Sequence, residues 1–285
     1  MTTIVVVVAD GHANSRVGLY NPATLIGGAR PHDPSTFQRK LWNECWLPFW
    51  EHVAKLKKKH KAEVVVIFNG DWIDYIMSHP AGLICLKRSD IKALAFSALE
   101  PALEVCDKAF MIKGTPRHTG TQGELEELLA EDITIAEPDP DTGTMAWYYL
   151  KAEFEGVLFD VAHHPSTSSR RPWTRAQAVA REGAVIRARY LENGERPPDV
   201  AFRGHVHWHG VSGPTPKPQT FFCHPWQLTT DYGYRIGYGT FFEPPGGYIL
   251  ICKDGKYELD IRTYKAKERG VWRQPKKSLL QKLIR

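Results

Sequence analysis

Aspartate and histidine residues recur in five short stretches of this 285-residue sequence. The stretches are Asp10-Gly11-His12, Gly70-Asp71-Trp72-Ile73-Asp74, Gly114-Thr115-Pro116-Arg117-His118, His163-His164-Pro165 and Gly204-His205-Val206-His207. Carboxylate oxygen and imidazole nitrogen suit borderline divalent metals, and none of the stretches contains a thiolate ligand. These side chains therefore predict a site for divalent metal ions such as Mn, Fe, Zn, Ni or Co.

The spacing within two of the stretches favours shared metal binding. Asp10 and His12 are separated by one glycine, so in an extended strand their side chains would point to the same side. His205 and His207 repeat this spacing. The two oxygens of a carboxylate such as Asp71 can bridge two metal ions, and two ions about 3.5–4 Å apart can clamp a phosphate group and activate a water molecule. We therefore predict a centre of two divalent metal ions that acts on a phosphoester substrate.

Each stretch follows an apolar segment that is predicted to be a strand. The predicted strands are Thr3–Ala9, Glu63–Asn69, Ala109–Lys113, Val157–His163 and Asp199–Arg203. In open α/β sheets the carboxyl ends of the strands are where ligands bind. The predicted elements thus bring all five stretches to one edge.

The remaining pattern predicts helices that cover these strands. Apolar residues at helical spacing predict helices over Thr36–His60 with Ser35 as its cap, Ser89–Lys108 with a kink or break at Pro101, Gly123–Glu131 and Trp173–Asn193. Further strands are predicted at Ala146–Phe154, which forms a hairpin with Val157–His163, and at Gln219–Cys223, Gly247–Cys252 and Tyr257–Tyr264. The expected fold class is α/β, a four-layer αββα sandwich in which two mixed β-sheets pack face to face with helices outside.

The five stretches, in this order, resemble the calcineurin-like metallophosphoesterase family. Its pattern runs D-x-H, G-D-x-x-D, G-N-H, a single His and G-H-x-H, and the matching blocks here span residues 10–207. The resemblance implies that the first metal is held by Asp10, His12 and His207, that Asp71 bridges, and that the second metal is held by His163 and His205. It also implies catalytic roles for His118, at the family position that binds substrate phosphate or protonates the leaving group, and for Asp74 as a supporting partner.

The third block departs from the family pattern, because the usual Asn ligand is absent and the His comes two residues late. Thr115 or a water molecule would take the place of the Asn. This variant is similar to some phage and prophage members of the family. The fourth block leaves two alternatives for the ligand, His163 or His164, and the H-x-P spacing favours His163. Asp74 alone could equally be a helix cap.

Other side chains near the motifs could bind the substrate. The guanidinium groups of Arg117 and Arg170 could grip phosphate oxygens. The tryptophans next to the motif loops could stack on a base or simply pack the loops; they are Trp72, Trp173, Trp208 and Trp226. His209 is expected at the rim of the site or on the surface.

Charge divides the chain into an expected metallophosphoesterase domain, residues 1–264, and a basic C-terminal tail, residues 265–285. From Arg262 onward there are nine Lys and Arg residues and a single acidic one, Glu268, so the tail could contact nucleic acid. The five cysteines form no C-x-x-C pair, and no apolar run is long enough for a membrane span. A cytoplasmic protein with reduced thiols and no membrane partner is expected, and the sequence leaves its oligomeric state unknown.

The predicted activity is hydrolysis of a phosphodiester, with a nuclease-like substrate favoured by the basic tail and the aromatic residues. One alternative is a phosphomonoesterase that acts on phosphoprotein or nucleotide. Another is a nonhydrolytic module that binds nucleic acid. The metal-ligand set argues against the last of these, because only the Asn position of the family pattern is missing.

Overall fold

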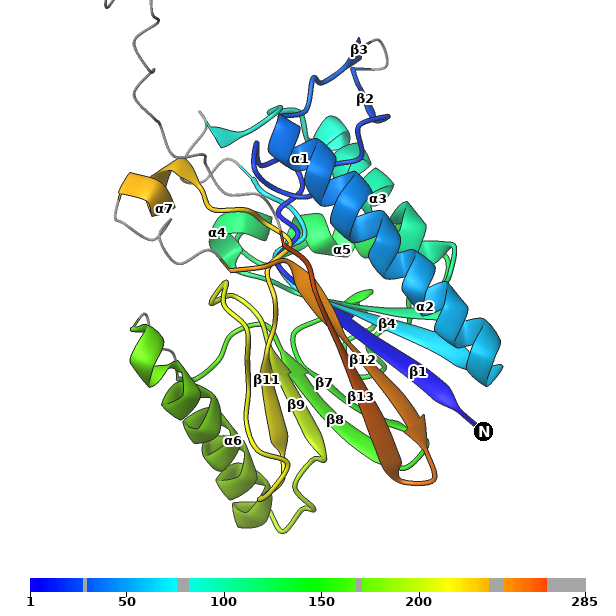
Figure 1. Cartoon of the computed structure of the whole chain (residues 1–285), viewed down its shortest axis with the longest axis vertical. Coiled ribbons are helices and arrows are strands. Elements are labelled where there is room, and N and C mark those ends of the chain that lie inside the picture. Colours follow the sequence, from blue (N-terminus) through cyan, green and yellow to red (C-terminus); the bar gives the residue numbers. More distant parts are fainter. Residues whose placement is uncertain (28–29, 76–81, 168–170, 236–242, 266–285) are drawn as a thin grey trace, which may run out of the picture.

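The computed structural model describes residues 1–27, 30–75, 82–167, 171–235 and 243–265. Two mixed β-sheets lie face to face, and helices cover the outer face of each (Figure 1). The chain is therefore the expected four-layer αββα sandwich. Arg170 and nearly all of the basic tail lie outside the described residues.

The first sheet has the strand order β13-β12-β1-β4-β5-β6. Its centre is parallel: β1 (Thr3–Val8) pairs with β4 (Glu63–Asn69), which pairs with β5 (Lys108–Ile112) and then the short β6 (Ala146–Trp147). On the other side of β1 the pairing turns antiparallel, through β12 (Gly246–Lys253) and β13 (Lys256–Thr263).

The second sheet has the order β10-β11-β9-β8-β7. Its central strands β8 (Val157–Ala162), β9 (Val200–Arg203) and β11 (Gln219–Phe222) are parallel, and the edge strands β7 (Leu150–Phe154) and β10 (Gly210–Val211) are antiparallel to their neighbours. The carboxyl ends of β1, β4 and β5 and those of β8 and β9 carry the five predicted stretches.

The helices divide between the two outer faces (Figure 1). A continuous helical run covers the first sheet; it comprises α1 (Thr36–Lys40), a π-helical segment (Leu41–Trp46) and α2 (Leu47–His60). The same face carries α3 (Arg88–Leu103) and α5 (Glu124–Glu131), whereas α6 (Arg175–Glu192), preceded by a 3-10 turn at Pro172–Thr174, covers the second sheet. The short helices α4 (Pro116–Thr119) and α7 (Asp231–Arg235) and the hairpin β2 (Leu25–Ile26) and β3 (Arg30–Pro31) complete the described elements.

Strand β1 shows why the sandwich needs both covering layers. Ile4, Val6 and Val8 pack with the helices of the first sheet, whereas Val5 and Val7 pack between the two sheets. All of these side chains are fully buried. A strand that is buried on both faces has a continuous apolar run rather than an alternating one, which is the pattern that predicted it.

Most predicted elements have the expected position, and three differ for identifiable reasons. The segment predicted as one strand, Ala146–Phe154, is split, because the chain leaves the first sheet after Trp147 and enters the second at Leu150. The helix predicted over Thr36–His60 contains the π-helical segment, and the Ser35 cap is confirmed by a capping box with Gln38. The helix containing Pro101 is a single element that ends at Leu103 rather than Lys108.

Pro101 is tolerated in α3 because its missing N–H is replaced. In an unbroken helix that group would donate to the carbonyl of Ser97. The side chain of Asn21 donates to this carbonyl instead, at 3.4 Å. The helix then ends two residues later, so few backbone hydrogen bonds are affected.

Candidate metal centre

The predicted loops meet at one edge of the sandwich, and backbone hydrogen bonds join them. The amide of Asp10 donates to the carbonyl of Gly70 at 3.0 Å, and that of His12 donates to the carbonyl of Asp71 at 2.8 Å. From the second sheet, the amide of His205 donates to Asp10 Oδ1 at 3.1 Å. Loops that are distant in sequence are thus joined by the chain's own hydrogen bonds.

The ligand pairs do not lie on extended strands, which corrects the expected geometry. Asp10, His12, Asp71, His205 and His207 all have positive φ, between 44° and 68°. This left-handed conformation costs a residue other than glycine about 1–3 kcal/mol, so the surrounding structure must enforce it. Tight left-handed turns, and not the alternation of a strand, bring Asp10 together with His12 and His205 together with His207.

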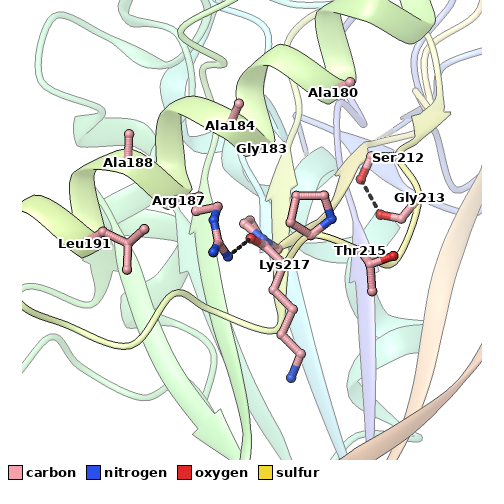
Figure 2. Close-up of a pocket in the computed structure, with 12 residues that line it drawn as sticks. Ala180, Gly183, Ala184, Arg187, Ala188, Leu191, Ser212, Gly213, Thr215 and Lys217 are labelled. Carbon is pink, nitrogen blue, oxygen red and sulfur yellow. Dashed lines mark hydrogen bonds between the residues drawn. The ribbon is translucent and has the colours of Figure 1, made fainter.

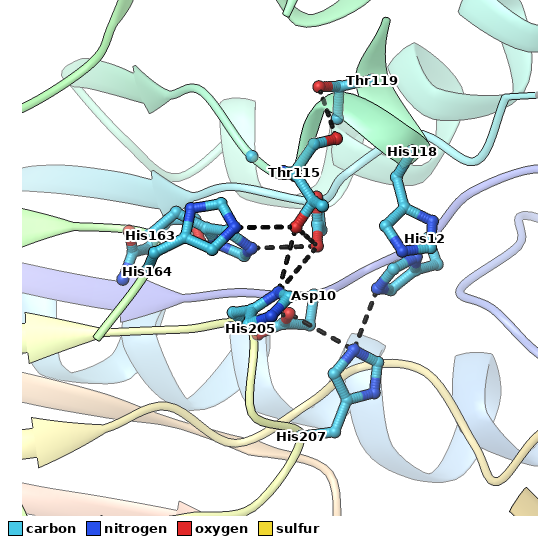
Figure 3. Close-up of polar contacts among 12 residues, drawn as sticks. Asp10, His12, Thr115, His118, Thr119, His163, His164, His205 and His207 are labelled. Atoms are coloured by element: carbon cyan, nitrogen blue, oxygen red, sulfur yellow. Dashed lines mark hydrogen bonds and ion pairs between the residues drawn. The ribbon is translucent and has the colours of Figure 1, made fainter. Parts of the chain in front are cut away.

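The first group of side chains consists of Asp10, His12 and His207, whose candidate ligand atoms all lie within 4.8 Å of one another. The Nε2 atoms of His12 and His207 are 3.0 Å apart, and His207 Nε2 is 3.4 Å from Asp10 Oδ1 (Figure 3). Asp10 and His12 are buried, whereas His207 is one-third exposed. The group is therefore closed behind and open to solvent in front.

The second group forms around Asp71 and the paired histidines after β8. His163 Nε2 lies 2.9 Å from Asp71 Oδ2, and His205 Nδ1 lies 3.9 Å from the same oxygen. His163 is buried, and its Nδ1 donates to the carbonyl of Asn69 at 2.7 Å. His164 is exposed, yet it forms a possible metal-binding group with His163 and His205. Both alternatives for the fourth block are thus within reach of this position, His163 from inside and His164 from the solvent side.

Thr115 lies where the predicted asparagine ligand is missing. Its Oγ1 is 2.9 Å from Asp71 Oδ2, 3.0 Å from His205 Nδ1 and 3.2 Å from His164 Nε2 (Figure 3). Its amide donates to Asp71 Oδ1 at 2.6 Å. An oxygen atom therefore faces the second group from the third block, as the interpretation of Thr115 requires.

The donor set fits divalent cations. The buried Nδ1 of His12 has no hydrogen-bond partner, and the buried Nε2 of His163 faces the carboxylate of Asp71 at 2.9 Å. A buried nitrogen without a hydrogen-bond partner is costly. A cation would satisfy such nitrogens, and oxygen and imidazole ligands without thiolate suit Mn, Fe, Zn, Ni or Co.

A third group, next to the first, consists of His12, Asp74 and His118. His118 stands on α4 with its Nδ1 2.6 Å from Asp74 Oδ1, and its ring meets that of His12 edge to face at 4.7 Å. Asp74 Oδ1 is also 3.6 Å from His12 Nδ1. The structure therefore places Asp74 beside two predicted functional histidines.

Burial and mutual charge perturb the acids and bases of the centre. Burial raises the pKa of Asp10 to about 6. Burial acts against ionised Asp71 too, but neighbouring His163 and its hydrogen bond hold the pKa of Asp71 well below its usual range. Burial opposes a proton on His163, yet Asp71 outweighs it and raises the pKa of His163 to about 10. Strong opposed shifts of neighbouring groups are typical of a functional site.

One buried carboxylate was missed by the sequence analysis. Glu126, on α5, is fully buried and accepts hydrogen bonds from the amides of Trp72 at 2.9 Å and Gly114 at 2.6 Å. Burial, followed by the charge of Asp71, raises the pKa of Glu126 to about 7. It joins the loops that carry Asp71 and Thr115. Nothing in its sequence context, an acidic helix, distinguishes it from the neighbouring glutamates, which are only partly buried.

The predicted substrate-binding residues have mixed outcomes. Arg117 is exposed on α4, next to His118. Trp72, Trp208 and Trp226 are buried, so they pack the loops and cannot stack on a base. Trp173 is 77% exposed at the start of the α6 layer. His209 is partly exposed, as expected, with its ring stacked on that of His224 at 4.2 Å.

A hollow of about 210 Å³ adjoins the centre. His207 forms one wall, and the others are formed by Pro225, Gln227, Leu228, Thr229, Thr230, Gly233 and Glu243. The side chain of Gln227 also lies 3.5 Å from Asp74 Oδ2. A group attached to a phosphate at the centre could enter this hollow.

A second hollow, of about 300 Å³, lies away from the centre between α6 and residues 212–218 (Figure 2). Alanine, glycine and proline form most of its wall, and Arg187 donates to the carbonyl of Lys217 at 3.3 Å. Its described lining includes no carboxylate or imidazole. It therefore lacks the chemistry of the metal centre.

Comparisons with known proteins add little to this description. No family model matches the chain, and no curated protein matches it. Among solved structures, a single mutant of Vps29 from Entamoeba histolytica has a TM-score of 0.39 and 10% identity, covering 92% of this chain and 99% of that one. A 5'-nucleotidase precursor from Thermus thermophilus has a TM-score of 0.40 and 10% identity, covering 92% of this chain and 54% of that one. These values are low.

None of the helices in the described part of the chain combines the length and the apolar character needed to cross a membrane.

Proposed function

We propose that this protein hydrolyses phosphoesters with the help of two divalent metal ions. The carrying observation is the convergence of side chains from both sheets. Asp10, His12 and His207 form one possible metal-binding group, and Asp10, Asp71 and His163 form another, each with ligand atoms within 4.8 Å. This convergence supports the family resemblance that the order of the motifs indicates.

The proposed ligands follow from the positions of the side chains. Asp10, His12 and His207 would hold the first cation, and Asp71 would be shared. The second cation would be held by His163 and His205, with Thr115 Oγ1 beside them and His164 on the solvent side. When bound, such a pair of ions supplies an activated water and neutralises charge that develops on the phosphate.

The chain's own contribution to catalysis would come from His118 and Asp74. Asp74 occupies Nδ1 of His118, which leaves Nε2 to hold a proton for the leaving alcohol. Arg117, exposed on the same short helix, is placed to contact the phosphate as it enters.

A phosphodiester, in a nuclease-like reaction, is the preferred substrate class. The hollow beside His207 offers space for a second group on the phosphate, lined by the amide of Gln227 and the hydroxyls of Thr229 and Thr230. The Lys- and Arg-rich tail supports a polyanionic substrate. A phosphomonoesterase acting on phosphoprotein or nucleotide is the second candidate.

The direct test is Asp71→Asn, with Asp254→Asn as its matched control. Asp254 also has positive φ, 49°, but it lies in the exposed turn between β12 and β13. With Mn²⁺ and bis-p-nitrophenyl phosphate, D71N should lose nearly all activity and D254N should keep it. Full activity in D71N would exclude the shared role of Asp71.

Two further measurements separate the substrate classes. A diesterase should cleave bis-p-nitrophenyl phosphate faster than p-nitrophenyl phosphate, and turnover of the monoester alone would reject the nuclease-like proposal. Removal of residues 265–285 should weaken binding of nucleic acid and leave hydrolysis of the small diester intact. Unchanged nucleic-acid binding would remove the tail from the proposal.

A further inference from the structure

A buried glutamate of α6 lies behind the histidine loops of the second sheet. Glu182 is 2% exposed. Its Oε2 accepts hydrogen bonds from the amide of Ser166 at 2.8 Å, the hydroxyl of Ser166 at 2.6 Å and the amide of Thr167 at 3.0 Å, and the hydroxyl of Thr167 is 3.3 Å away. Ser166 follows His164 by two residues, so this one oxygen ties down the loop that carries His163 and His164.

The other oxygen of Glu182 holds the neighbouring ligand loop through Arg203. Arg203 Nε donates to Glu182 Oε1 at 3.1 Å, and its second terminal nitrogen donates to Asp160 Oδ1 at 2.8 Å. The guanidinium also donates to the carbonyl of Phe202 at 2.8 Å. Arg203 is the last residue of β9 and precedes His205 by two positions. A single carboxylate therefore connects the histidines that follow β8 to those that follow β9.

This arrangement requires a carboxylate. Both oxygens of Glu182 accept hydrogen bonds from N–H or O–H donors on opposite sides. Both side-chain atoms at this place must therefore be acceptors. A glutamine at the same place has only one oxygen. Its NH₂ group would face either the amides of Ser166 and Thr167 or the guanidinium of Arg203, donor against donor. Buried charges are costly to desolvate, and well-packed apolar residues could have filled this interface at no electrostatic cost.

The first sheet shows the same device in Glu126. That residue comes from the opposite outer helical layer and accepts from the amides of Trp72 and Gly114, next to Asp71 and Thr115. In the described part of the chain, each outer helical layer thus contributes a buried glutamate, Glu126 from α5 and Glu182 from α6, that contacts two ligand loops from the side away from the solvent.

We infer that Glu182 is a positioning residue for the second metal site, holding His163, His164 and His205 in register, while Glu126 positions the Asp71 that both sites share. The inference rests on the proposed function, because it concerns the same two-metal centre. Loss of an outer partner that orients metal ligands typically weakens metal binding about 10- to 100-fold. Glu182 binds the loop of His163 and His164 directly, whereas it reaches the loop of His205 and His207 only through Arg203, so its loss should act mainly on the second site.

The experiment compares three variants of the full chain by calorimetric titration with Mn²⁺. Glu182→Gln should weaken binding at the second site about 10- to 100-fold and affect the first site, whose His207 lies farther along the same loop, much less. Glu126→Gln should weaken both events. Asp199→Asn is the matched control, since Asp199 is also buried and accepts from the Leu158 amide at 2.8 Å, but at the opposite end of β9. It should lower the melting temperature and change neither event.

Heteronuclear NMR of the imidazole rings in metal-free protein gives a second readout. The resonances of His164 and His205 should shift in E182Q and stay in place in D199N. Equal weakening of both metal sites in E182Q would overturn the inference, as would unchanged metal binding with unchanged imidazole resonances. If the wild-type protein binds no metal, the proposed function fails; the ring resonances still decide whether Glu182 positions the histidines.

Discussion

Asp74 Oδ1 lies 2.6 Å from His118 Nδ1 and 3.6 Å from His12 Nδ1. One carboxylate therefore serves a predicted metal ligand and the predicted proton donor. Burial acts against its negative charge, but His12 and the hydrogen bond to His118 outweigh this and hold the pKa of Asp74 well below its usual range. It stays ionised throughout the range in which the protein would work.

His118→Gln tests whether this histidine protonates the leaving group. General acid catalysis contributes about 10²–10⁴-fold, and it matters most when the leaving alcohol is a poor one. H118Q should lose about this much on a thymidine dinucleotide and far less on bis-p-nitrophenyl phosphate, whose leaving group needs no proton. Steady-state rates on both substrates at saturating Mn²⁺ provide the measurement. Equal losses on the two substrates would point to phosphate binding instead.

Thr115→Val and Thr115→Asn test the unusual third block. Valine removes the oxygen that lies 2.9 Å from Asp71 and 3.0 Å from His205, while keeping the branched shape. We expect T115V to weaken the second metal and T115N, which supplies an amide oxygen, to bind it at least as tightly as wild type. Metal content after dialysis against a series of Mn²⁺ concentrations measures this. Unchanged occupancy in T115V would show that the Thr115 oxygen is not needed to bind the second metal.

Gly114→Ala tests how tightly the Asp71 and Thr115 loops pack. A Cβ at Gly114 would lie 2.3 Å from both the amide nitrogen and Oδ1 of Asp71, so either the loop or the carboxylate must move. We expect loss of both metal sites with only partial loss of thermal stability. Gly82→Ala is the control, because its Cβ would meet nothing within 4 Å. Full metal binding by G114A would mean that the loop adapts freely.

The pH dependence of stability can be traced to His224. This side chain is buried, with Nδ1 3.0 Å from the carbonyl of Pro244. Burial, followed by neighbouring His209, lowers the pKa of His224 from 6.5 to about 3. Between these values the unfolded chain binds a proton that the folded chain does not, so the free energy of unfolding falls as pH decreases, by at most about 1.4 kcal/mol per unit.

His224→Phe should therefore flatten this part of the stability curve. We expect a lower free energy of unfolding than wild type at pH 8, where only packing and one hydrogen bond are lost, and a smaller difference at acid pH. Urea unfolding at a series of pH values, with a chelator present, measures both effects. Parallel curves for variant and wild type would rule out the buried neutral histidine as the cause.

The strands and the order of the ligand loops could be predicted because they depend on local pattern. Thr3–Val8 and Glu63–Asn69 are apolar on both faces, and each is followed by a carboxylate and a glycine. The crossing of the chain from one sheet to the other at Tyr148 and Tyr149 could not be predicted. A continuous alternating segment does not indicate which sheet each of its parts joins.

The backbone conformation of the ligand loops and the buried glutamates behind them could not be predicted from the sequence either. The left-handed conformation of Asp10 and His12 depends on hydrogen bonds to the Gly70 and Asp71 carbonyls, which a sequence does not show. Glu126 and Glu182 lie in helices rich in charge, where only tertiary burial separates them from solvent-facing neighbours. The candidate metal ligands can therefore be recognised in the sequence. The residues that orient them cannot, because their role depends on contacts between distant parts of the chain.

The proposed ligands come from both sheets: Asp10 and Asp71 follow strands of one, and His163 and His207 follow strands of the other. Cations bound between these side chains would link the two sheets to each other. Removal of the ions should loosen the contact between the two sheets at the edge that carries the ligand loops, while the apolar side chains between the sheets keep the rest of the interface packed. The same metal ions would then contribute both to the stability of the contact between the two sheets and to the hydrolysis of substrate.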